Sequence, residues 1–431
     1  MEFIAVREDI MNNKNNTGES GKTIKLLNRG TYGCVFKPGL TCDGMIDKSK
    51  TTISKIQKDK ETSENELYVS KKIREITNYS RYFAPINESC EIDMGNIENS
   101  EINKCEFIYE QSKSGKPMKF EMNKLIYVGK NTLGNHLMQL LEKTKDLDEF
   151  AKEFINSYKI LLEGLRKLSD KDLIHHDIKE NNVMCRDTTG RPILIDFGLS
   201  FEASSMLSTT SNELFDVFYA YSAEYAPWCV EISIISYILN VIGKDMETVP
   251  DVLNLPASEE LLTECIEEYF EKNLGMETLC NQVKCDEYKS NLKTYFSKII
   301  KNVSFGTIKW KKIVEELIQY HNTWDVYSLT ICYLQLFDQL KIEDIDEIPF
   351  MREFKNMLLD ILLTIPSERL DAKNCTNKLK KIQKVKKQEL KAMETLLIDY
   401  NENKDKAKER RKHYVNSKMK MREVETAMSL L

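Results

Sequence analysis

Hydrophobic and polar positions along the chain predict short strands in its N-terminal third. Residues 24–36 and 51–57 have the alternation of strands around a glycine-containing turn, and residues 62–77 have helical spacing. Two more strands are expected at 105–111 and 122–128, where apolar and β-branched or aromatic residues gather. This part of the chain is therefore expected to be rich in β-structure.

The rest of the pattern is mostly helical. Residues 149–170 place large apolar side chains at helical spacing, and two short strands are expected at 182–185 and 192–195. A loop rich in Ser and Thr follows to about residue 223, and nearly everything from 229 onward has helical periodicity. Strands that precede helices predict an α+β fold with a β-rich small lobe and a helical large lobe.

Composition adds a division of charge. The 431 residues are 41% hydrophobic, which is enough for a sizeable core, and carry a net charge of −6. Residues 371–431 hold 17 Lys and Arg against 9 Asp and Glu, or +8, so the remaining chain carries −14. No apolar run approaches the roughly 18 residues of a membrane span, and the polar, Asn-rich residues 1–22 are expected to be a loose leader rather than a signal peptide.

The eleven cysteines are scattered and odd in number, which favours free thiols in a reducing cytoplasm. Cys280 and Cys285 lack a second pair of ligands nearby, so zinc is not expected there and free thiols are favoured. Cys34 and Cys42 flank the predicted nucleotide loop, where packing is the default role and redox sensitivity is the alternative. The expected location is the cytoplasm.

A phosphate-binding loop is imitated by T-G-E-S-G-K-T at 17–23. A true P-loop has Gly or Ala at its first position, a strand before it and a helix after it. Here Asn16 holds the first position and a predicted strand follows, so we interpret the run as part of the leader.

The run I-H-H-D-I-K-E-N-N-V at 174–183, followed by P-I-L-I-D-F-G-L-S at 192–200, carries more chemistry. Phosphoryl transfer to a hydroxyl needs a carboxylate at the acceptor oxygen, a cation on the travelling phosphate and oxygen ligands for Mg²⁺. Asp177, Lys179 and Asn182 supply one of each in a single loop, and Asp196 adds a carboxylate.

This spacing resembles the H-R-D-x-K-x-x-N and D-F-G motifs of eukaryotic-type protein kinases. The resemblance implies a bilobal protein-kinase fold with ATP and Mg²⁺ as cofactors. It implies that Asp177 accepts the proton of the substrate hydroxyl, that Lys179 steadies the γ-phosphate, and that Asn182 and Asp196 bind the metal ion. Lys179 after the predicted catalytic Asp favours Ser or Thr over Tyr as the acceptor.

The same resemblance assigns roles near the N-terminus. Residues 27–35, L-N-R-G-T-Y-G-C-V, resemble a kinase glycine-rich loop with Asn28 in place of the first glycine. Gly30 and Gly33 would allow backbone N–H groups to approach phosphate oxygens, and Val35 would cap the adenine ring.

A lysine that anchors ATP is expected on the strand after this loop. Lys55 is the first choice and Lys58 the fallback, because Lys58 has left the strand pattern. The glutamate that orients the lysine is expected on the next helix, as Glu66 or alternatively Glu64.

Two later segments resemble structural motifs of the large lobe of kinases. Asp325 in T-W-D-V-Y-S-L is expected to brace the backbone of the catalytic loop, and Arg369 in I-P-S-E-R-L is expected in a buried ion pair. The A-P-E motif occurs as A-P-W without its glutamate, which leaves Glu231 or Glu224 as the partner of Arg369.

His176 departs from the kinase pattern, because it replaces the arginine that normally receives a phosphate on the activation segment. Control by phosphorylation of that segment is therefore less expected. A helical insert at about 229–322, with G-T-Y-G-C-V-F-K-P-G-L-T-C at 30–42 and Y-H-N-T-W-D-V-Y-S-L at 320–329, resembles the serine/threonine kinases of large nucleocytoplasmic DNA viruses. Such a viral protein would act in an infected cell's cytoplasm or be associated with the virion.

The resulting division of the chain is a leader (1–22), an N-lobe (23–130), a C-lobe with the insert (131–375) and a basic helical tail (376–431). The expected function is transfer of the ATP γ-phosphate to Ser or Thr of protein substrates. A pseudokinase scaffold that binds partners through insert and tail, and a small-molecule kinase, are alternatives. The tail is either a solvated basic helix or a contact for nucleic acid or another acidic surface.

Overall fold

The structure is a computed structural model, and it describes residues 24–30, 33–49, 51–97, 100–143, 147–206, 212–301, 308–340 and 349–382. The predicted leader, the run at 17–23 and most of the basic tail lie outside these residues. The combination of a small antiparallel sheet with many helices confirms the predicted α+β class. Within the described ranges, no helix is long and apolar enough to cross a membrane.

The described chain divides into two compact units. The first contains the described residues from 24 to 60 together with Asn87–Tyr127. The second contains Glu61–Ile86 and the described residues from 128 to 382. The change of unit at 127/128 lies near the predicted lobe boundary at 130, whereas the whole helix expected at 62–77 groups with the second unit.

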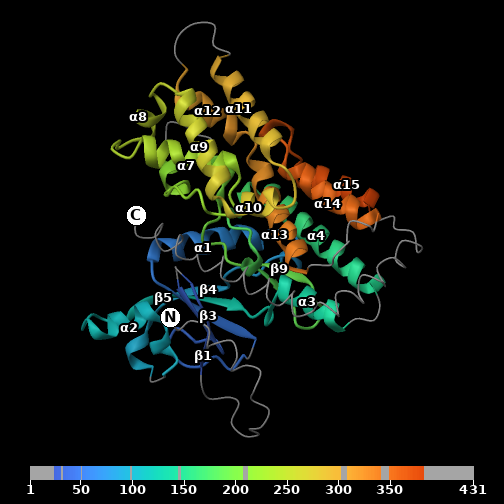
Figure 1. Ribbon diagram of the computed structural model, residues 1–431. Helices are drawn as coiled ribbons and strands as arrows, with labels where there is room; N and C mark the ends of the chain where they lie inside the picture. Colours follow the sequence, from blue (N-terminus) through green and yellow to red (C-terminus); the bar gives the residue numbers. More distant parts are fainter. Residues whose placement is uncertain are drawn as a thin grey trace. The chain divides into compact units, whose positions relative to one another are not determined.

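The first unit is built on a five-stranded antiparallel sheet with the order β1-β2-β3-β5-β4 (Figure 1). Alternating side chains on one face, including Phe36, Ile56 and Met122, form its core. The strands and short helices of this unit are β1 (Lys25–Arg29), β2 (Gly33–Lys37), β3 (Thr52–Gln57), β4 (Glu88–Asp93), η2 (Met94–Asn96), η3 (Ile102–Lys104), α2 (Glu106–Lys113) and β5 (Lys119–Ile126).

The strand predicted at 105–111 is wrong, because Glu106–Lys113 forms helix α2. A strand would have buried every second residue, including Tyr109, but Tyr109 is 40% exposed while Ile108 is fully buried. Cys105 and Ile108, three residues apart, instead face the same core. The short apolar run was therefore ambiguous between the two periods, and packing decided it.

The prediction of free thiols is wrong for six of the eleven cysteines. Disulfides join Cys34 to Cys105, Cys42 to Cys90 and Cys280 to Cys285. The first two pairs are 71 and 48 residues apart in the sequence, so spacing alone did not indicate them. The other five cysteines are buried thiols: Cys185, Cys229, Cys265, Cys332 and Cys375.

The second unit contains two small antiparallel sheets and most of the helices. β6 (Asn131–Thr132), β8 (Val183–Cys185) and β9 (Pro192–Leu194) form one sheet, and β7 (Leu173–Ile174) pairs with β10 (Phe201–Glu202) in the other. The helices before the insert are α1 (Lys60–Arg74), η1 (Tyr79–Arg81), α3 (Leu133–Lys143), α4 (Leu147–Ser169), η4 (Glu180–Asn182), α5 (Ala203–Met206) and α6 (Glu213–Val217).

Helix α4 confirms the amphipathic helix expected at 149–170. Its predicted apolar stripe, which includes Phe150, Phe154 and Tyr158, is buried. It packs in one core with α13 (Trp324–Leu340), α14 (Pro349–Leu362) and α15 (Ala372–Ile382). Helix α15 continues across the predicted start of the tail at 376, and Leu379 and Ile382 are buried in that core.

The insert is helical as predicted and is part of the second unit. α7, α9, α11 and α12 gather with α8 at one end of this unit (Figure 1), and share a core with Trp324 and Tyr327. Its elements are α7 (Val230–Tyr237), the π-helix η5 (Ile238–Ile242), α8 (Val249–Leu253), α9 (Glu259–Lys272), α10 (Leu274–Cys280), α11 (Asp286–Lys301), α12 (Trp310–Ile318) and η6 (His321–Thr323). η8 (Pro366–Glu368) follows α14.

Candidate functional site

The loop between β7 and η4 carries the predicted catalytic residues, and a buried carboxylate braces its backbone. Asp325, at the start of α13, accepts hydrogen bonds from the N–H groups of His175 (2.7 Å) and His176 (2.9 Å). Burial raises the pKa of Asp325, while the two N–H donors oppose that shift. His176 has a φ of 65°, a conformation that a non-glycine residue keeps only when its surroundings impose it. The predicted role of Asp325 is confirmed.

The structure brings Asp177, Lys179 and Asn182 together. The Oδ2 atom of Asp177 accepts a hydrogen bond from Asn182 Nδ2 (2.8 Å) and lies 3.1 Å from Lys179 Nζ. Asn182 Nδ2 also donates to the backbone carbonyl of Asp177 at 2.9 Å. Because a carboxylate and a carbonyl both need a donor, these two contacts identify this end of the amide as the nitrogen.

Tyr225 belongs to the same site, and sequence reasoning missed it. Its hydroxyl donates to Asp177 Oδ1 and accepts from Lys179 Nζ at 3.1 Å. Tyr225 is only 1% exposed, and its ring lies 4.9 Å from that of Trp228. The one signal in the sequence was its place directly before the A-P pair at 226–227.

The two predicted metal ligands lie on neighbouring backbone segments. The N–H of Ile195 donates to the carbonyl of Asn182 at 3.0 Å, which extends the pairing of β8 with β9 toward Asp196. Asp196 follows β9 with a φ of 64°. An amide oxygen and a carboxylate fit Mg²⁺, which usually takes one or two protein oxygens and completes its shell with phosphate oxygens and water. In the part of the chain that the structure describes, no cluster of three or more His, Cys, Asp or Glu could hold a metal ion.

Helix α1 is fastened to the segment after Asp196. Asn65 Nδ2 donates to the carbonyls of Gly198 (3.2 Å) and Ser200 (3.0 Å). One residue later, Glu66 is 1% exposed, whereas Glu64 faces solvent. A buried carboxylate must be partnered, so burial favours Glu66 over Glu64 as the functional glutamate.

In the first unit, three predicted nucleotide residues lie in one row across the sheet. Asn28 on β1 is opposite Val35 on β2, and Val35 is opposite Lys55 on β3. Directly paired residues of antiparallel strands project to the same face. Lys55 is 8% exposed, whereas Lys58 lies beyond β3 and is exposed, so burial favours Lys55.

The two glycines of the predicted loop have different surroundings. The N–H of Gly30 donates to the carbonyl of Gly33 at 2.9 Å and closes the turn. A Cβ atom on Gly33 would lie 2.4 Å from the carbonyl oxygen of Ile56, so the approach of β3 already requires glycine there. Asn28 sits beside a β-bulge between β1 and β2.

Two buried basic side chains lie in the second unit near this loop. His176 is surrounded by aromatic rings, and neither ring nitrogen has a hydrogen-bond partner among the described residues. The rings are those of Phe201, Phe218 and Trp228. Arg369 instead forms a buried, bidentate pair with Glu231. The predicted ion pair of Arg369 is thereby confirmed with Glu231, whereas Glu224 is exposed.

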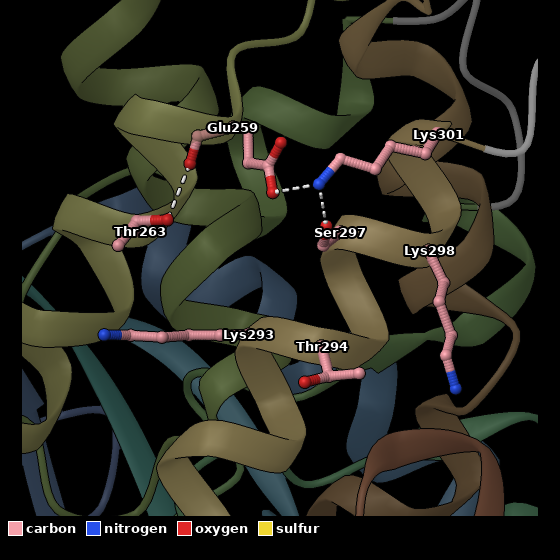
Figure 2. Close-up of a pocket in the computed structure, with 7 residues that line it drawn as sticks. All are labelled: Glu259, Thr263, Lys293, Thr294, Ser297, Lys298 and Lys301. Atoms are coloured by element: carbon pink, nitrogen blue, oxygen red, sulfur yellow. Dashed lines mark hydrogen bonds and ion pairs between the residues drawn. The ribbon is translucent and has the colours of Figure 1, made fainter.

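An open groove of about 760 Å³ lies between α9 and α11 in the insert (Figure 2). Lys301 reaches from α11 to Glu259 on α9 at 3.1 Å and contacts Ser297 at 2.8 Å, while Lys298 points away from them (Figure 2). The groove contains none of the predicted site residues, and its lysines are partly used in ion pairs on the surface. We therefore place the candidate site at Asp177.

No family model matches the chain. The kinase resemblance and its viral branch accordingly stay predictions that depend on the residues quoted above. The predicted site residues fall into two groups, each described within its own unit. Asn28, Gly30, Gly33, Val35 and Lys55 belong to the first unit, and Glu66, Asp177, Lys179, Asn182 and Asp196 belong to the second.

Proposed function

We propose that the protein is a serine/threonine protein kinase with a bilobal kinase fold, which transfers the γ-phosphate of ATP to protein hydroxyls. The observation that carries the proposal is the hydrogen-bonded group of Asp177, Lys179 and Asn182 on a loop braced by Asp325. A carboxylate, a cation and an amide oxygen within one loop are what positioning catalysis of phosphoryl transfer needs.

The chemistry follows from the roles of these side chains. The acceptor oxygen forms a bond to the γ-phosphorus while the bond from phosphorus to the β,γ-bridging oxygen breaks, and ADP leaves. The hydroxyl proton passes to Asp177, and Lys179 balances the charge of the transferred group. Mg²⁺ held by Asn182 and Asp196 would neutralise charge on the phosphates.

ATP itself would be bound by the predicted nucleotide residues. In the first unit, Lys55 would bind phosphate, Gly30 and Gly33 would give backbone access, and Val35 would contact adenine beside Asn28. A protein with this activity fits the viral kinases that the sequence resembles, acting in the cytoplasm of an infected cell or in the virion.

The test is transfer of ³²P from [γ-³²P]ATP and Mg²⁺ to a basic protein substrate, followed by phosphoamino-acid analysis. Asp177→Asn keeps the size of the side chain but removes the base, so we expect a loss of at least about 100-fold. Lys298→Ala, an exposed change in the insert, is the matched control and should match the wild type.

Equal transfer by wild type and Asp177→Asn would contradict the assignment. Wild type that binds ATP without transferring phosphate would favour the scaffold alternative. Labelled small molecules in place of labelled Ser or Thr would favour the small-molecule kinase.

A further inference from the structure

The helical insert contacts the site through the start of α10. Three consecutive residues there meet three consecutive residues of the segment 222–228, which we name the Tyr225 segment. Asn273 Nδ2 donates to the carbonyl of Tyr225 at 2.9 Å, and the N–H of Leu274 lies 3.4 Å from the carbonyl of Glu224. A Cβ atom on Gly275 would lie 2.8 Å from the carbonyl of Ala226, so this contact needs glycine.

Asn273 uses both ends of its amide. Its Oδ1 accepts from the N–H groups of Gly275 (2.9 Å) and Met276 (3.1 Å), which caps α10. These two donors fix which end is oxygen, so the nitrogen must face Tyr225. Asn273 is 1% exposed and therefore makes these bonds away from water. The capping residue of an insert helix is thus also a donor to the Tyr225 segment.

Tyr225 is consequently held at both ends. Its carbonyl is bound by Asn273, and its hydroxyl lies between Asp177 and Lys179. The neighbouring Trp228 adds two more ties, since its indole N–H donates to the carbonyl of His176 at 3.3 Å and its own carbonyl accepts from Tyr269 at 3.1 Å. Tyr269 is a residue of insert helix α9.

This arrangement indicates that Tyr225 is a permanent hydrogen-bond donor to Asp177. The alternative is an inhibitory side chain that blocks the acceptor site and must move before the substrate binds. Among the described residues, Asp177 Oδ2 accepts from Asn182 and Lys179, whereas Oδ1 accepts from Tyr225. A carboxylate oxygen has two lone pairs, so Oδ1 retains one for an acceptor hydroxyl. Rotating the Tyr225 side chain away would break its buried bonds to Asp177 and Lys179, and moving the Tyr225 backbone would also break the bond from Asn273.

We propose that Asn273 is a positioning residue for phosphoryl transfer, through which the insert holds Tyr225 against Asp177 and Lys179. The inference rests on the proposed function. It gives the insert a specific task, which is to fix the rotamers of the base and the lysine from outside their own loop.

The first test compares kcat and the KM for ATP of wild type, Asn273→Ser and Ser258→Ala. Serine retains a capping oxygen for α10 but has no amide to reach Tyr225. Ser258 caps α9 and has no hydrogen bond to the Tyr225 segment, so its loss controls for a weakened insert helix. We expect Asn273→Ser to lower kcat about fivefold to tenfold, the factor of one neutral hydrogen bond, with KM for ATP unchanged.

The second test is a double-mutant cycle with Tyr225→Phe, which removes only the hydroxyl. We expect Tyr225→Phe to lower kcat at least tenfold and Asn273→Ser to cause little further loss in that background. Additive losses would mean a structural effect unconnected to Tyr225 and would overturn the inference. A higher kcat in Tyr225→Phe would also overturn the inference, because it would show that the Tyr225 hydroxyl blocks the acceptor site.

Failure of the inference is distinct from failure of the proposed function. Wild type without transfer rejects the kinase assignment. Active wild type with an equally active Asn273→Ser rejects only the positioning role. Melting temperatures of Asn273→Ser and Ser258→Ala close to each other, with kcat lowered only in Asn273→Ser, support it.

Discussion

His176 and Arg369 are both buried bases near the Tyr225 segment, but their surroundings treat charge in opposite ways. Arg369 meets the carboxylate of Glu231, whereas His176 meets aromatic rings. Burial alone would lower the pKa of Arg369, but Glu231 beside it raises that pKa. Burial, with a smaller effect of His175, lowers the pKa of His176 to about 3.

The different surroundings of His176 and Arg369 indicate how the Tyr225 segment is held in place. A charged base at position 176 would be suited to receive a phosphate, and a neutral ring in an aromatic box is not. The Tyr225 segment is instead held by the tilted ring contact of its Trp228 with His176 and by the bond from Asn273, and the buried pair of Arg369 and Glu231 lies just after it in the chain. We infer that the contacts of the fold keep Tyr225, Lys179 and Asn182 beside Asp177 without a phosphate on this segment.

The largest expected effect on stability comes from breaking the buried ion pair of Arg369 and Glu231. Glu231→Gln leaves the Arg369 guanidinium buried with no carboxylate, so we expect a loss of about 3–5 kcal/mol in the free energy of unfolding. Urea denaturation measures it. Asp170→Asn, which breaks the exposed pair with Arg166, is the control and should change stability by less than about 1 kcal/mol. A similarly small loss for Glu231→Gln would refute the account of this pair.

The neutral half of the comparison predicts a dependence on pH. Between pH 6.5 and 3 the unfolded chain protonates His176 while the folded chain does not, so stability falls as pH falls. His176→Phe removes this pH-dependent contribution to the free energy of unfolding. The wild type should therefore lose about 2–3 kcal/mol more than His176→Phe between pH 7 and pH 4.5, at about 1.4 kcal/mol per pH unit.

The measurement is urea unfolding of both proteins across this range, and the neutral-pH difference serves as the baseline. A difference between the two proteins that stays constant with pH would show that His176 titrates normally and is not buried as described.

The smallest expected effect concerns ion pairs at the surface. Lys301→Ala removes the pair with Glu259 in the groove of Figure 2, where both side chains are largely exposed. We expect a change in stability below about 0.5 kcal/mol that shrinks further in 0.5 M salt. Thermal unfolding at two salt concentrations checks this, and a large loss that salt leaves unchanged would mean that the groove is structurally important.

How well a contact of the site could be predicted depends on how far apart its residues lie in the sequence. Asp177, Lys179 and Asn182 lie within one loop, so their spacing in the sequence already places them together. The brace by Asp325 spans 150 residues and was predicted only because its own local motif is distinctive. Tyr225 and Asn273 lie 48 residues apart, and no local pattern links a capping asparagine to a tyrosine carbonyl.

Burial favours one member of each pair of residues that spacing left open. Glu231 and Glu224 both lie near the A-P pair, but only Glu231 is inside the core, and the same distinction separates Lys55 from Lys58 and Glu66 from Glu64. The two long-range disulfides, Cys34–Cys105 and Cys42–Cys90, and helix α2 depend on which strands and loops become neighbours, which spacing in the sequence does not show.

We propose that the phosphoryl-transfer site is already assembled without phosphate on the segment that follows Asp196. The most direct measurement is the initial rate of ³²P transfer by protein that intact mass spectrometry shows to be free of phosphate. Half of that preparation is first incubated with unlabelled ATP and Mg²⁺ and then desalted. We predict transfer without a lag and at the same rate in both halves. No transfer by either half, or transfer that begins only after the protein has taken up phosphate on this segment, would contradict the account.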